Sequence, residues 1–391
     1  MFSVRLNHRR EANDFAFLIA YLESVYKEVF SVNSRDKKFQ NVTIKDVARE
    51  AGVSYATVSR VINNYKHVTP EKRERVVSAM TRLGYVVNQQ ARSLAGGRSQ
   101  VIGLLVPDVG NSYIGEVIRG IDDELAANQY DLMLYTTHRQ KTKESIYVAT
   151  LTRGMTDGLL LLLPLNPHAY LKALHTKQFP YVVIDHQGFD DFSSTIVAHN
   201  YEGAYAAISY LIDLGHRRIG LISGTPELSS AIERLHGYKQ ALADRGIAFD
   251  PELVENGDFR QPSSYIAAGK LLDLPNPPTA IFAASDISAF GVYDAAHMRN
   301  LQIPQDISII GFDDIPEAAV TYPRLTTVRQ PLAEMGRLAT RMLLDELNHP
   351  TGVIQRIELD TELMIRDSCQ PPSSDGEQLL GREEVLGQED R

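Results

Sequence analysis

From residue 101 onward, short apolar runs alternate with segments of helical periodicity, and this alternation restricts the fold more than any other feature of the sequence. The runs include VIGLLVP, GLLLLL, RIGLISG, TAIFAAS and ISIIGFD. Strands that are apolar on both faces belong to parallel sheets that helices cover on each side. The sequence therefore predicts an α/β fold.

Two such series follow one another along the chain, and their similarity predicts two lobes. The first series ends near YVVIDH at 181–186, and the second runs from a helix at 201–214 to ISIIGFD at 307–313. The remaining segment, a helix at 331–347 between LTTVRQP and QRIELDTELMIR, is longer than one lobe requires. We therefore expect it to cross back between both lobes.

Ahead of these series, TIKDVAREAGVSYATVSRVIN at 43–63 carries the signals of two short helices. Thr43 is a suitable N-cap with Asp46 three residues later, and Gly52 is suited to end the first helix. Ser54 then caps the second. The apolar residues of the first helix recur at the spacing of one buried face and are Ile44, Val47, Ala48 and Ala51. Two helices joined by a tight glycine turn predict a helix-turn-helix.

The outer face of the second helix suggests what it contacts. Its inner residues are Val58, Val61 and Ile62, and the residues left outside are Tyr55, Ala56, Ser59, Arg60 and Asn63. Arginine can form two hydrogen bonds to a guanine edge, serine and threonine can bind phosphate, and tyrosine or alanine can contact a thymine methyl. The alternative is a solvated amphipathic hairpin.

A third helix with its own start and stop signals favours the DNA-binding interpretation. Thr69 caps this helix, Pro70 occupies its first position, and Gly84 stands where a left-handed residue ends a helix. Its expected inner face consists of Val76, Val77, Met80 and Leu83. Three capped helices predict a small DNA-binding domain.

The charge is distributed as expected for a chain of which only one end binds a polyanion. The net charge of the 391 residues is −9, yet residues 1–100 hold 17 Lys and Arg against 9 Asp and Glu, a net +8. By subtraction from 40 and 49, the other residues hold 23 against 40, a net −17.

The single cysteine, Cys369, excludes a disulfide or a thiolate metal cluster within one chain. No apolar run approaches the roughly 20 residues that span a bilayer, so we expect a cytoplasmic protein that does not bind membranes.

Seven blocks of the sequence together resemble the lactose/galactose repressor (LacI/GalR) family over roughly residues 42–368. Besides TIKDVAREAGVSYATVSRVIN they are RLGYVVNQQARSL, IGLLVPDVGNSYIGEVIRGI, LGHRRIGLI, ERLHGY, ASDISAFGV and ISIIGFDD, in that order. The resemblance implies that the N-terminal helices bind an operator as a dimer and that a hinge helix enters the minor groove. It also implies a core that is built like a periplasmic sugar-binding protein and takes a small effector.

Position by position, the resemblance assigns base reading to Tyr55, Ala56 and Arg60. Leu94 matches a leucine that parts a base step at the operator centre, although it could also be a core leucine. The complete expected DNA-contacting set is Thr43, Ser54, Tyr55, Ala56, Thr57, Ser59, Arg60, Asn63, Asn88, Ala91 and Leu94.

In the core, Arg234 and Asp313 match positions that hold polar groups of the effector. A guanidinium donates and a carboxylate accepts from paired hydroxyls, which suits a sugar; the alternative is a salt bridge between the lobes. Phe259 matches a ring that lines the pocket, and its alternative is a core phenylalanine. The complete expected effector-binding set is Asp108, Asn111, Ser112, Tyr113, Arg234, Phe259, Ser285, Asp286 and Asp313.

Two residues depart from the family pattern. Ser285 stands where many sugar-responsive relatives have asparagine, and His199 stands where aspartate is common. Both departures weaken any transfer of a relative's effector to this chain.

These features divide the chain into five expected regions. They are an N-terminal extension, expected to be mobile, at 1–41, a helix-turn-helix domain at 42–87, a hinge at 88–99, a two-lobed effector-binding and dimerisation core at 100–368, and a disordered acidic tail at 369–391.

The sequence thus predicts a homodimeric, sequence-specific repressor that binds a near-palindromic operator and responds to a small effector, a sugar, without a cofactor. Enzyme motifs such as G-x-S-x-G, Walker A and H-E-x-x-H are absent from the sequence, and its histidines lack metal-ligand spacing. A secreted sugar-binding protein would account for the core but not for the helix-turn-helix. A nucleoid-type architectural protein would not need a two-lobed pocket.

Overall fold

The computed structural model describes residues 42–62, 68–85, 98–186 and 190–372. The chain forms two compact units, Met1–Asn88 and Gln89–Arg391. The expected N-terminal extension and most of the expected hinge and tail lie outside the described residues. In the part of the chain that is described, no helix has the length and apolarity that crossing a membrane requires.

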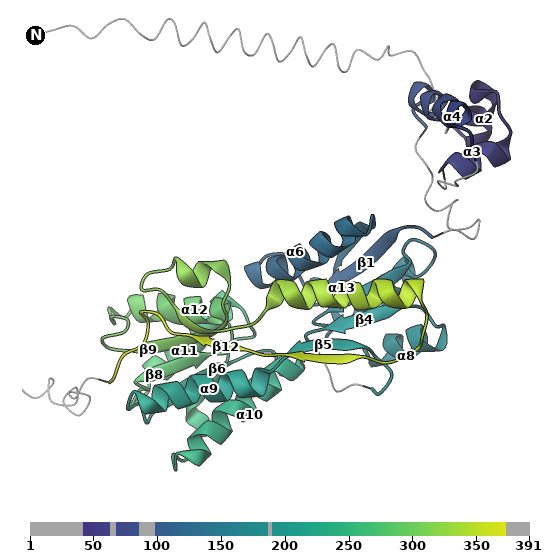
Figure 1. Ribbon diagram of the computed structural model, residues 1–391. Coiled ribbons are helices and arrows are strands. Elements are labelled where there is room, and N and C mark those ends of the chain that lie inside the picture. The colour runs from purple at the N-terminus through teal and green to yellow at the C-terminus, as the bar shows by residue number, and fades with distance from the viewer. Residues whose placement is uncertain (1–41, 63–67, 86–97, 187–189, 373–391) are drawn as a thin grey trace, which may run out of the picture. The chain divides into compact units, whose positions relative to one another are not determined.

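The described residues of the first unit form three helices, which are α2 Ile44–Ala51, α3 Tyr55–Ile62 and α4 Pro70–Leu83 (Figure 1). The Asp46 carboxylate accepts hydrogen bonds from the backbone N–H of Thr43 at 3.0 Å and from its hydroxyl at 2.7 Å. Gly52 and Gly84 follow α2 and α4, each with a φ of 61°. Glycine adopts this left-handed conformation without the steric cost of a side chain, so the predicted helix ends are confirmed.

The core of this unit differs from the sequence expectation at one residue of α4. Val77 was expected to face inward but is 52% exposed, whereas Ala79 is fully buried. Residues on one face of a helix recur three, four and seven positions apart, which places Ala79, Met80 and Leu83 on the face of Val76. Val77 lies one position, about 100° of rotation, away from that face.

The second unit has two lobes, each built on a sheet that has six strands in the described residues. In lobe 1 the strand order is β11-β5-β4-β3-β1-β2, and every neighbouring pair is parallel. The strands are β1 Val101–Val106, β2 Asp131–Thr136, β3 Gly158–Leu162, β4 Tyr181–Ile184, β5 Thr195–Ala198 and β11 Arg356–Leu359. One face is covered by α6 Ser112–Ala127 and α13 Leu332–Asn348, and the other by α7 Lys141–Leu151 and α8 His168–Thr176.

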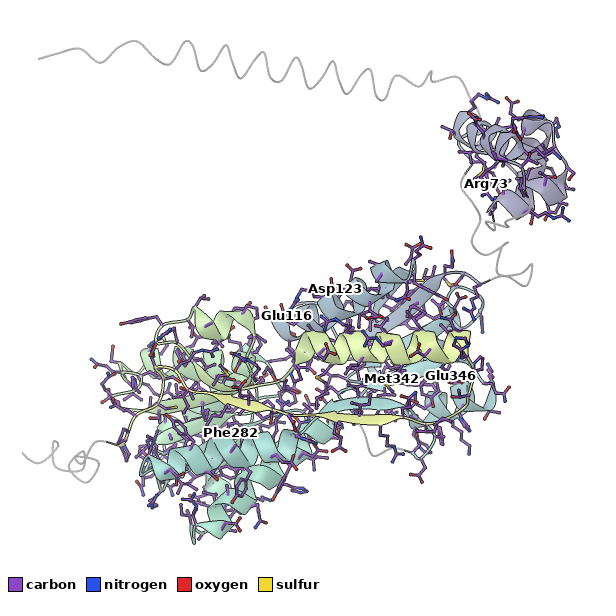
Figure 2. All side chains as sticks on the ribbon, in the orientation of Figure 1. Arg73, Glu116, Asp123, Phe282, Met342 and Glu346 are labelled. Atoms are coloured by element: carbon purple, nitrogen blue, oxygen red, sulfur yellow. The ribbon has the colours of Figure 1, made fainter. Side chains whose placement is uncertain are left out.

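In lobe 2 the strand order is β12-β10-β9-β8-β6-β7, and only β12 runs antiparallel to its neighbour among these described strands. The strands are β6 Ile219–Ser223, β7 Val254–Asn256, β8 Ala280–Ala283, β9 Ser308–Asp313, β10 Thr326–Arg329 and β12 Glu362–Met364. The helices are α9 Asn200–Asp213 and α10 Ser229–Asp244 on one face, α11 Gln261–Leu272 and α12 Asp286–His297 on the other, and the 3-10 turns η1 Pro251–Leu253 and η2 Pro316–Ala319. Phe282 of β8 is fully buried in the core beneath α9 and α10 (Figure 2).

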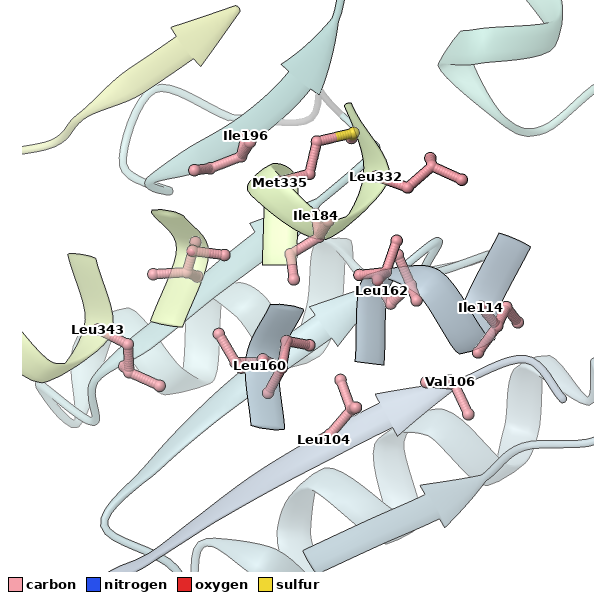
Figure 3. Packing of buried hydrophobic residues seen from close by; sticks show 14 of the residues in the cluster. Leu104, Val106, Ile114, Leu160, Leu162, Ile184, Ile196, Leu332, Met335 and Leu343 are labelled. Carbon is pink, nitrogen blue, oxygen red and sulfur yellow. The ribbon is translucent and has the colours of Figure 1, made fainter. Parts of the chain in front are cut away.

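Alternate residues of the central strands pack against opposite helix layers. In β3, Leu160 and Leu162 lie in the core formed with α6 and α13 (Figure 3), whereas Leu159 and Leu161 pack with α7 and α8. All four side chains are buried. Both faces of the sheet are therefore apolar, which explains why the sequence shows continuous apolar runs instead of alternation.

Within the described residues the polypeptide passes between the lobes three times, from β5 to α9, from β10 to α13 and from β11 to β12 (Figure 1). The expected crossing of the C-terminal segment is confirmed. The sequence predicts neither β5 nor the first crossing, because β5 is only four residues long and no turn signal separates it from α9.

Candidate functional site

The exposed face of α3 carries the side chains that the sequence assigns to base reading. Tyr55 is 53% exposed, and Ala56 and Arg60 are also exposed. Val58 and Val61 of the same helix are buried in the core of the first unit. The two helical faces are therefore separated as the amphipathic pattern predicts, and the surface side chains are available to a partner.

Hydroxyl side chains gather at the start of α3. The hydroxyl of Ser54 accepts a hydrogen bond from the backbone N–H of Thr57 at 3.2 Å, and the two hydroxyl oxygens are 2.9 Å apart. Thr43 is exposed before α2, and Ser59 is half-buried. Hydroxyls beside a helix N-terminus suit a phosphate group, because the first backbone N–H groups of a helix point outward there. The remaining members of the predicted DNA-contacting set lie outside the described residues and are Asn63, Asn88, Ala91 and Leu94.

Arg75 of α4 holds the turn that orients α3. Its Nη2 donates to the backbone carbonyl oxygens of Ala51 at 2.5 Å and Gly52 at 3.0 Å. A Cβ added at Gly52 would lie 2.5 Å from the same Nη2. The turn between α2 and α3 is thus tied directly to the third helix.

A cavity of about 570 Å³, including space open to solvent, lies between the two lobes of the second unit. Six of the nine expected effector-binding residues, all of them in the described part of the chain, line it: Asn111, Tyr113, Arg234, Phe259, Ser285 and Asp313. The other lining residues are Pro107, Ile114, Arg139, Leu163, Leu165, Asp185, Leu228, Ser230 and Ile287. Many of them follow the carboxyl ends of strands, where open parallel sheets bind ligands.

Unusual backbone conformations are concentrated around this cavity. Among the described lining residues, five have positive φ: Arg139 at 57°, Leu163 at 49°, Asp185 at 55°, Phe259 at 52° and Asp313 at 120°. Each such residue costs about 1–3 kcal/mol and persists only where the surrounding structure compensates. The five residues lie where β2, β3, β4, β7 and β9 end, and strained backbone of this kind is often found at binding sites.

Arg234 of α10 is 2% exposed and lies in the wall of the cavity. Its Nε donates to Oδ1 of Asn200 at 2.8 Å, and its Nη1 donates to the backbone carbonyl of Ala284 and to Oδ1 of Asp313 at 3.4 Å. Arg234 and Asp313 both belong to lobe 2. The alternative of a salt bridge between the lobes is therefore wrong, because the ion pair lies within one lobe.

Two aromatic rings flank the Arg234 guanidinium. Its central carbon lies 3.7 Å from the centroid of the Phe312 ring and 5.7 Å from that of the Phe259 ring. Phe259 is half-buried, and a Cβ added at Gly224 would lie 1.9 Å from its ring. Glycine at that position lets the ring lie against the backbone, so Phe259 forms part of the cavity wall.

Asp313 is 3% exposed at the end of β9. Its Oδ1 accepts a hydrogen bond from Nε2 of Gln330 at 2.7 Å as well as the bond from Arg234. Burial raises the pKa of this carboxyl to about 7, although the nearby Arg234 cation opposes that rise. The carboxyl therefore changes its charge near neutral pH.

Asp185 is a lining residue that the sequence-predicted set does not contain. It follows β4 and is 2% exposed, and its Oδ2 accepts a hydrogen bond from the Tyr113 hydroxyl at 2.6 Å. Its other oxygen, Oδ1, is buried without a hydrogen-bond partner in the described part of the molecule. Burial raises the pKa of Asp185 and also raises that of Tyr113 well above its ordinary value. Its position at the carboxyl end of a predicted strand is the signal that could have identified it.

Residues of the loop after β1 hold that loop in place. Oδ1 of Asn111 accepts a hydrogen bond from the backbone N–H of Ile114 at 3.0 Å and so caps α6. Asp108 does not line the cavity; its Oδ2 accepts a hydrogen bond from Nε of Arg139 at 3.0 Å. Asn111 thus lines the cavity while its carbonyl oxygen is already engaged, and Asp108 neutralises a cation at the rim.

Ser285 and Asp286 have different roles in the structure. The Ser285 hydroxyl accepts a hydrogen bond from the backbone N–H of Ser288 at 3.1 Å, which caps α12 at the cavity wall. Asp286 does not line the cavity and is fully buried. Its carboxylate accepts hydrogen bonds from the Thr327 hydroxyl at 2.5 Å and the Ile315 backbone N–H at 2.9 Å. Burial, and then the neighbouring Asp313 charge, raise the pKa of Asp286 well above its ordinary value.

Direct contacts connect the two lobes at the rim of the cavity. Ser112, which does not line the cavity, donates its hydroxyl to a carboxylate oxygen of Glu317 in lobe 2. Nζ of Lys141 in lobe 1 lies 2.8 Å from Oε1 of Glu227 in lobe 2. The lobes are therefore in contact in this structure, and opening the cavity would require that these bonds break.

Two family models match the chain. The model for bacterial regulatory proteins of the lacI family matches residues 43–88, and the model for the periplasmic binding protein-like domain matches residues 208–369. The chain is 37% identical over 328 residues to the HTH-type transcriptional repressor PurR of Proteus mirabilis (strain HI4320), which covers 83% of this chain and 96% of that protein.

Solved structures of transcriptional regulators are also similar to the chain. A complex of the transcriptional regulator CelR with cellobiose has a TM-score of 0.65 and 32% sequence identity, covering 84% of this chain and 99% of that one. The lac repressor dimer bound to operator and the anti-inducer ONPF has a TM-score of 0.75 and 27% identity, covering 85% of this chain and 100% of that one. The similarity extends over both compact units.

Proposed function

The chain belongs to the lacI family of bacterial regulatory proteins, and on that basis we propose that it is a repressor whose hold on a near-palindromic operator is controlled by a sugar bound between its lobes. It is a DNA-binding transcriptional regulator and not an enzyme. One base-reading helix per chain reaches one half-site, so a homodimer is needed to occupy two. The dimeric lac repressor, which is similar over most of the chain, supports this assembly.

The observation that carries the proposal is the separation of exposed and buried side chains on opposite sides of α3. Tyr55, Ala56 and Arg60 are exposed together on a helix whose opposite side is buried. Ser54 precedes the same helix and Thr57 and Ser59 belong to it, and their hydroxyls are the phosphate contacts that we propose. Thr43, Asn63, Asn88, Ala91 and Leu94 complete the proposed DNA-contacting set.

We propose the following organisation for the protein in the cytoplasm. Residues 42–87 bind DNA, residues 88–99 form a hinge, and residues 100–368 bind the effector and dimerise, while 1–41 are an N-terminal extension and 369–391 an acidic tail. The cavity in the second unit and the cellobiose complex of the similar regulator CelR support a sugar as the effector. Asn111, Tyr113, Arg234, Phe259, Ser285 and Asp313 are the proposed contacts.

The substitution Arg60→Ala tests the proposed reading role. Once the operator has been selected from random DNA, the variant should lose about 1–3 kcal/mol of binding free energy at a single base pair in each half-site. Gel-shift titration against operators that carry single base changes measures this loss.

Arg82→Ala is a suitable control, because Arg82 is an exposed arginine of the same unit that pairs with Glu50 on α2. It removes the same charge without altering α3, so its base preferences should equal those of the original protein. Equal weakening by Arg60→Ala on all DNA sequences would make Arg60 a phosphate contact and would contradict the reading role.

A further inference from the structure

The side chain of Arg98 lies at the end of the proposed hinge and bonds to segments of two helices. Its Nη2 donates to the backbone carbonyl of Leu347, and its Nη1 donates to Oδ1 of Asn348 at 2.6 Å. Nη1 also donates to the Tyr130 hydroxyl at 3.4 Å. Leu347 and Asn348 end α13, and Tyr130 follows the end of α6. One guanidinium therefore joins the C-terminal ends of both helices.

The end of α13 is a chemically suitable partner for a guanidinium. The last four carbonyl groups of a helix have no donor within the helix, and the helix dipole places partial negative charge there. Arginine supplies both hydrogen-bond donors and a positive charge. Tyr130 is also fixed at the end of α6, because its backbone N–H donates to the carbonyl of Leu125 at 3.0 Å. Arg98 thus bonds to groups that follow the positions of the two helices.

The backbone beside Arg98 is attached to the sheet by a separate anchor. The Asp157 carboxylate accepts hydrogen bonds from the backbone N–H of Ser99 at 2.7 Å and of Gln100 at 2.8 Å, and from the Ser99 hydroxyl at 2.9 Å. Asp157 directly precedes β3. Since this anchor already holds the chain on lobe 1, the bonds of the Arg98 side chain add a specific link to the helices.

The opposite ends of the same two helices lie at the cavity. Asn111 caps α6 and Tyr113 belongs to its first turn, and both residues line the cavity. Gln330 lies just before α13, and its Nε2 donates to Oδ1 of the lining residue Asp313 at 2.7 Å. Each helix therefore begins beside the cavity and ends beside Arg98.

Between these ends α6 and α13 lie side by side and run in the same direction (Figure 1). A Cβ added at Gly120 of α6 would lie 1.8 Å from the backbone oxygen of Ala333 in α13. Further along both helices, Nη2 of Arg341 lies 3.0 Å from Oε2 of Glu124. Helices in such close backbone contact shift together, so a displacement at the cavity reaches both C-terminal ends.

We propose, resting on the proposed function, that Arg98 is the positioning residue that links the state of the cavity to the hinge. Its guanidinium ties the hinge to the ends of α6 and α13, so a shift of these helices displaces the hinge where it enters the core. Coupling between two binding sites is reciprocal. Operator binding at the other end of the hinge should therefore alter the starts of both helices at the cavity.

Hydrogen–deuterium exchange of the full chain with operator DNA tests this link without an effector. The operator is the duplex that the protein selects from random DNA, and an unrelated duplex of equal length shows the effect of non-specific binding. Relative to the unrelated duplex, operator should change the amide exchange rates of residues 112–120 and 332–340 several-fold. Most of this change should be lost in Arg98→Gln.

Arg356→Gln is the matched control. Arg356 is an exposed arginine of β11 in the same lobe, and its Nη2 donates to the backbone carbonyl of Asp190 at 2.9 Å. This variant loses the same charge and a similar bond at a loop, so it should keep the full operator-dependent change. Arg98→Lys keeps the charge but has one nitrogen in place of the planar fork, and it should show an intermediate change.

Three results would overturn the proposal. They are a full change that persists in Arg98→Gln, an equal loss in Arg356→Gln, and helix starts that do not respond to operator in the original protein. A purely structural role of Arg98 would alter exchange at the end of α13 equally with and without operator and would leave the remote change intact. Failure to select any DNA sequence would instead refute the proposed function.

Discussion

At the scale of single residues, Arg234 combines folding and proposed ligand binding. It is almost completely buried, and its guanidinium holds Asn200, the Ala284 carbonyl and Asp313. Arg234→Ala would leave the Asp313 carboxyl buried with the hydrogen bond from Gln330 but without its cationic partner, and breaking a buried ion pair in this way typically costs about 3–5 kcal/mol. We expect a loss of unfolding free energy in this range, measured by chemical denaturation.

Loss of effector binding in Arg234→Ala is therefore informative only if the variant remains folded. Arg234→Lys keeps the positive charge but not the planar guanidinium, so its stability should lie between that of Arg234→Ala and that of the original protein. A value for Arg234→Ala within about 1 kcal/mol of the original protein would contradict the structural role.

The raised pKa of the Asp313 carboxyl predicts that the free energy of unfolding depends on pH. Burial raises its pKa from 3.8 to about 7, so between these values the folded protein binds more protons at this site than the unfolded chain. Its contribution to stability is complete below about pH 4 and is lost as the pH rises through about 7. Denaturation curves between pH 5 and pH 8 should show this loss.

Asp313→Asn supplies the comparison for that experiment. The variant cannot ionise at this position, so its stability should decline less between pH 5 and pH 8 than that of the original protein. Identical slopes would show that Asp313 titrates at its ordinary pKa. A sugar that donates to the ionised carboxylate should also bind more tightly at pH 8 than at pH 5.

At the scale of elements, the contact between α6 and α13 depends on glycine. A Cβ added at Gly120 of α6 would lie 1.8 Å from the backbone oxygen of Ala333, and one added at Gly336 of α13 would lie 2.1 Å from that of Val117. Because these obstacles are backbone atoms, they cannot move aside without a shift of a helix. We expect Gly120→Ala to cost about 1–3 kcal/mol of unfolding free energy in the second unit, measured by chemical denaturation.

Gly115 provides a matched control in the same helix. It is exposed in α6, and no atom lies within 4 Å of a Cβ built there. Gly115→Ala should therefore stabilise the unit by about 0.5–1 kcal/mol through helix propensity alone. The opposite signs of the two changes test the helix contact, and equal effects would count against it.

At the scale of the whole molecule, the proposed regulation requires coupling between operator and effector. An effector can shift DNA affinity only by its different affinities for the two functional states, typically about 1–3 kcal/mol. Reciprocity then requires that operator DNA change effector affinity by the same factor. Operator titrations with and without effector give one factor, and effector titrations with and without operator give the other. We expect the two factors to agree within error.

Two results would contradict this coupling. An effector whose affinity is the same with and without operator cannot regulate DNA binding through the protein's equilibrium. An altered operator affinity with no reciprocal change would indicate that the compound acts on the DNA or at another site. Saturation with unrelated double-stranded DNA is the control for non-specific charge effects.

The sequence by itself determined the order and type of most elements. Capping residues, glycine stops and apolar spacing predicted α2, α3 and α4, because these signals act within a few residues of the chain. Continuous apolar runs predicted the buried parallel sheets. The match to a known pattern identified Arg234, Phe259 and Asp313, which the structure brings to one cavity.

Only the tertiary structure decided which polar groups face that cavity. Asp286 was expected there but is bonded to Thr327 and Ile315 behind the wall, whereas Asp185 was not selected and lines it. The ion pair of Arg234 lies within one lobe, which local spacing could not reveal. The direction of a side chain at a strand end depends on the crossings and on the packing of distant segments, and no short stretch of sequence contains that information.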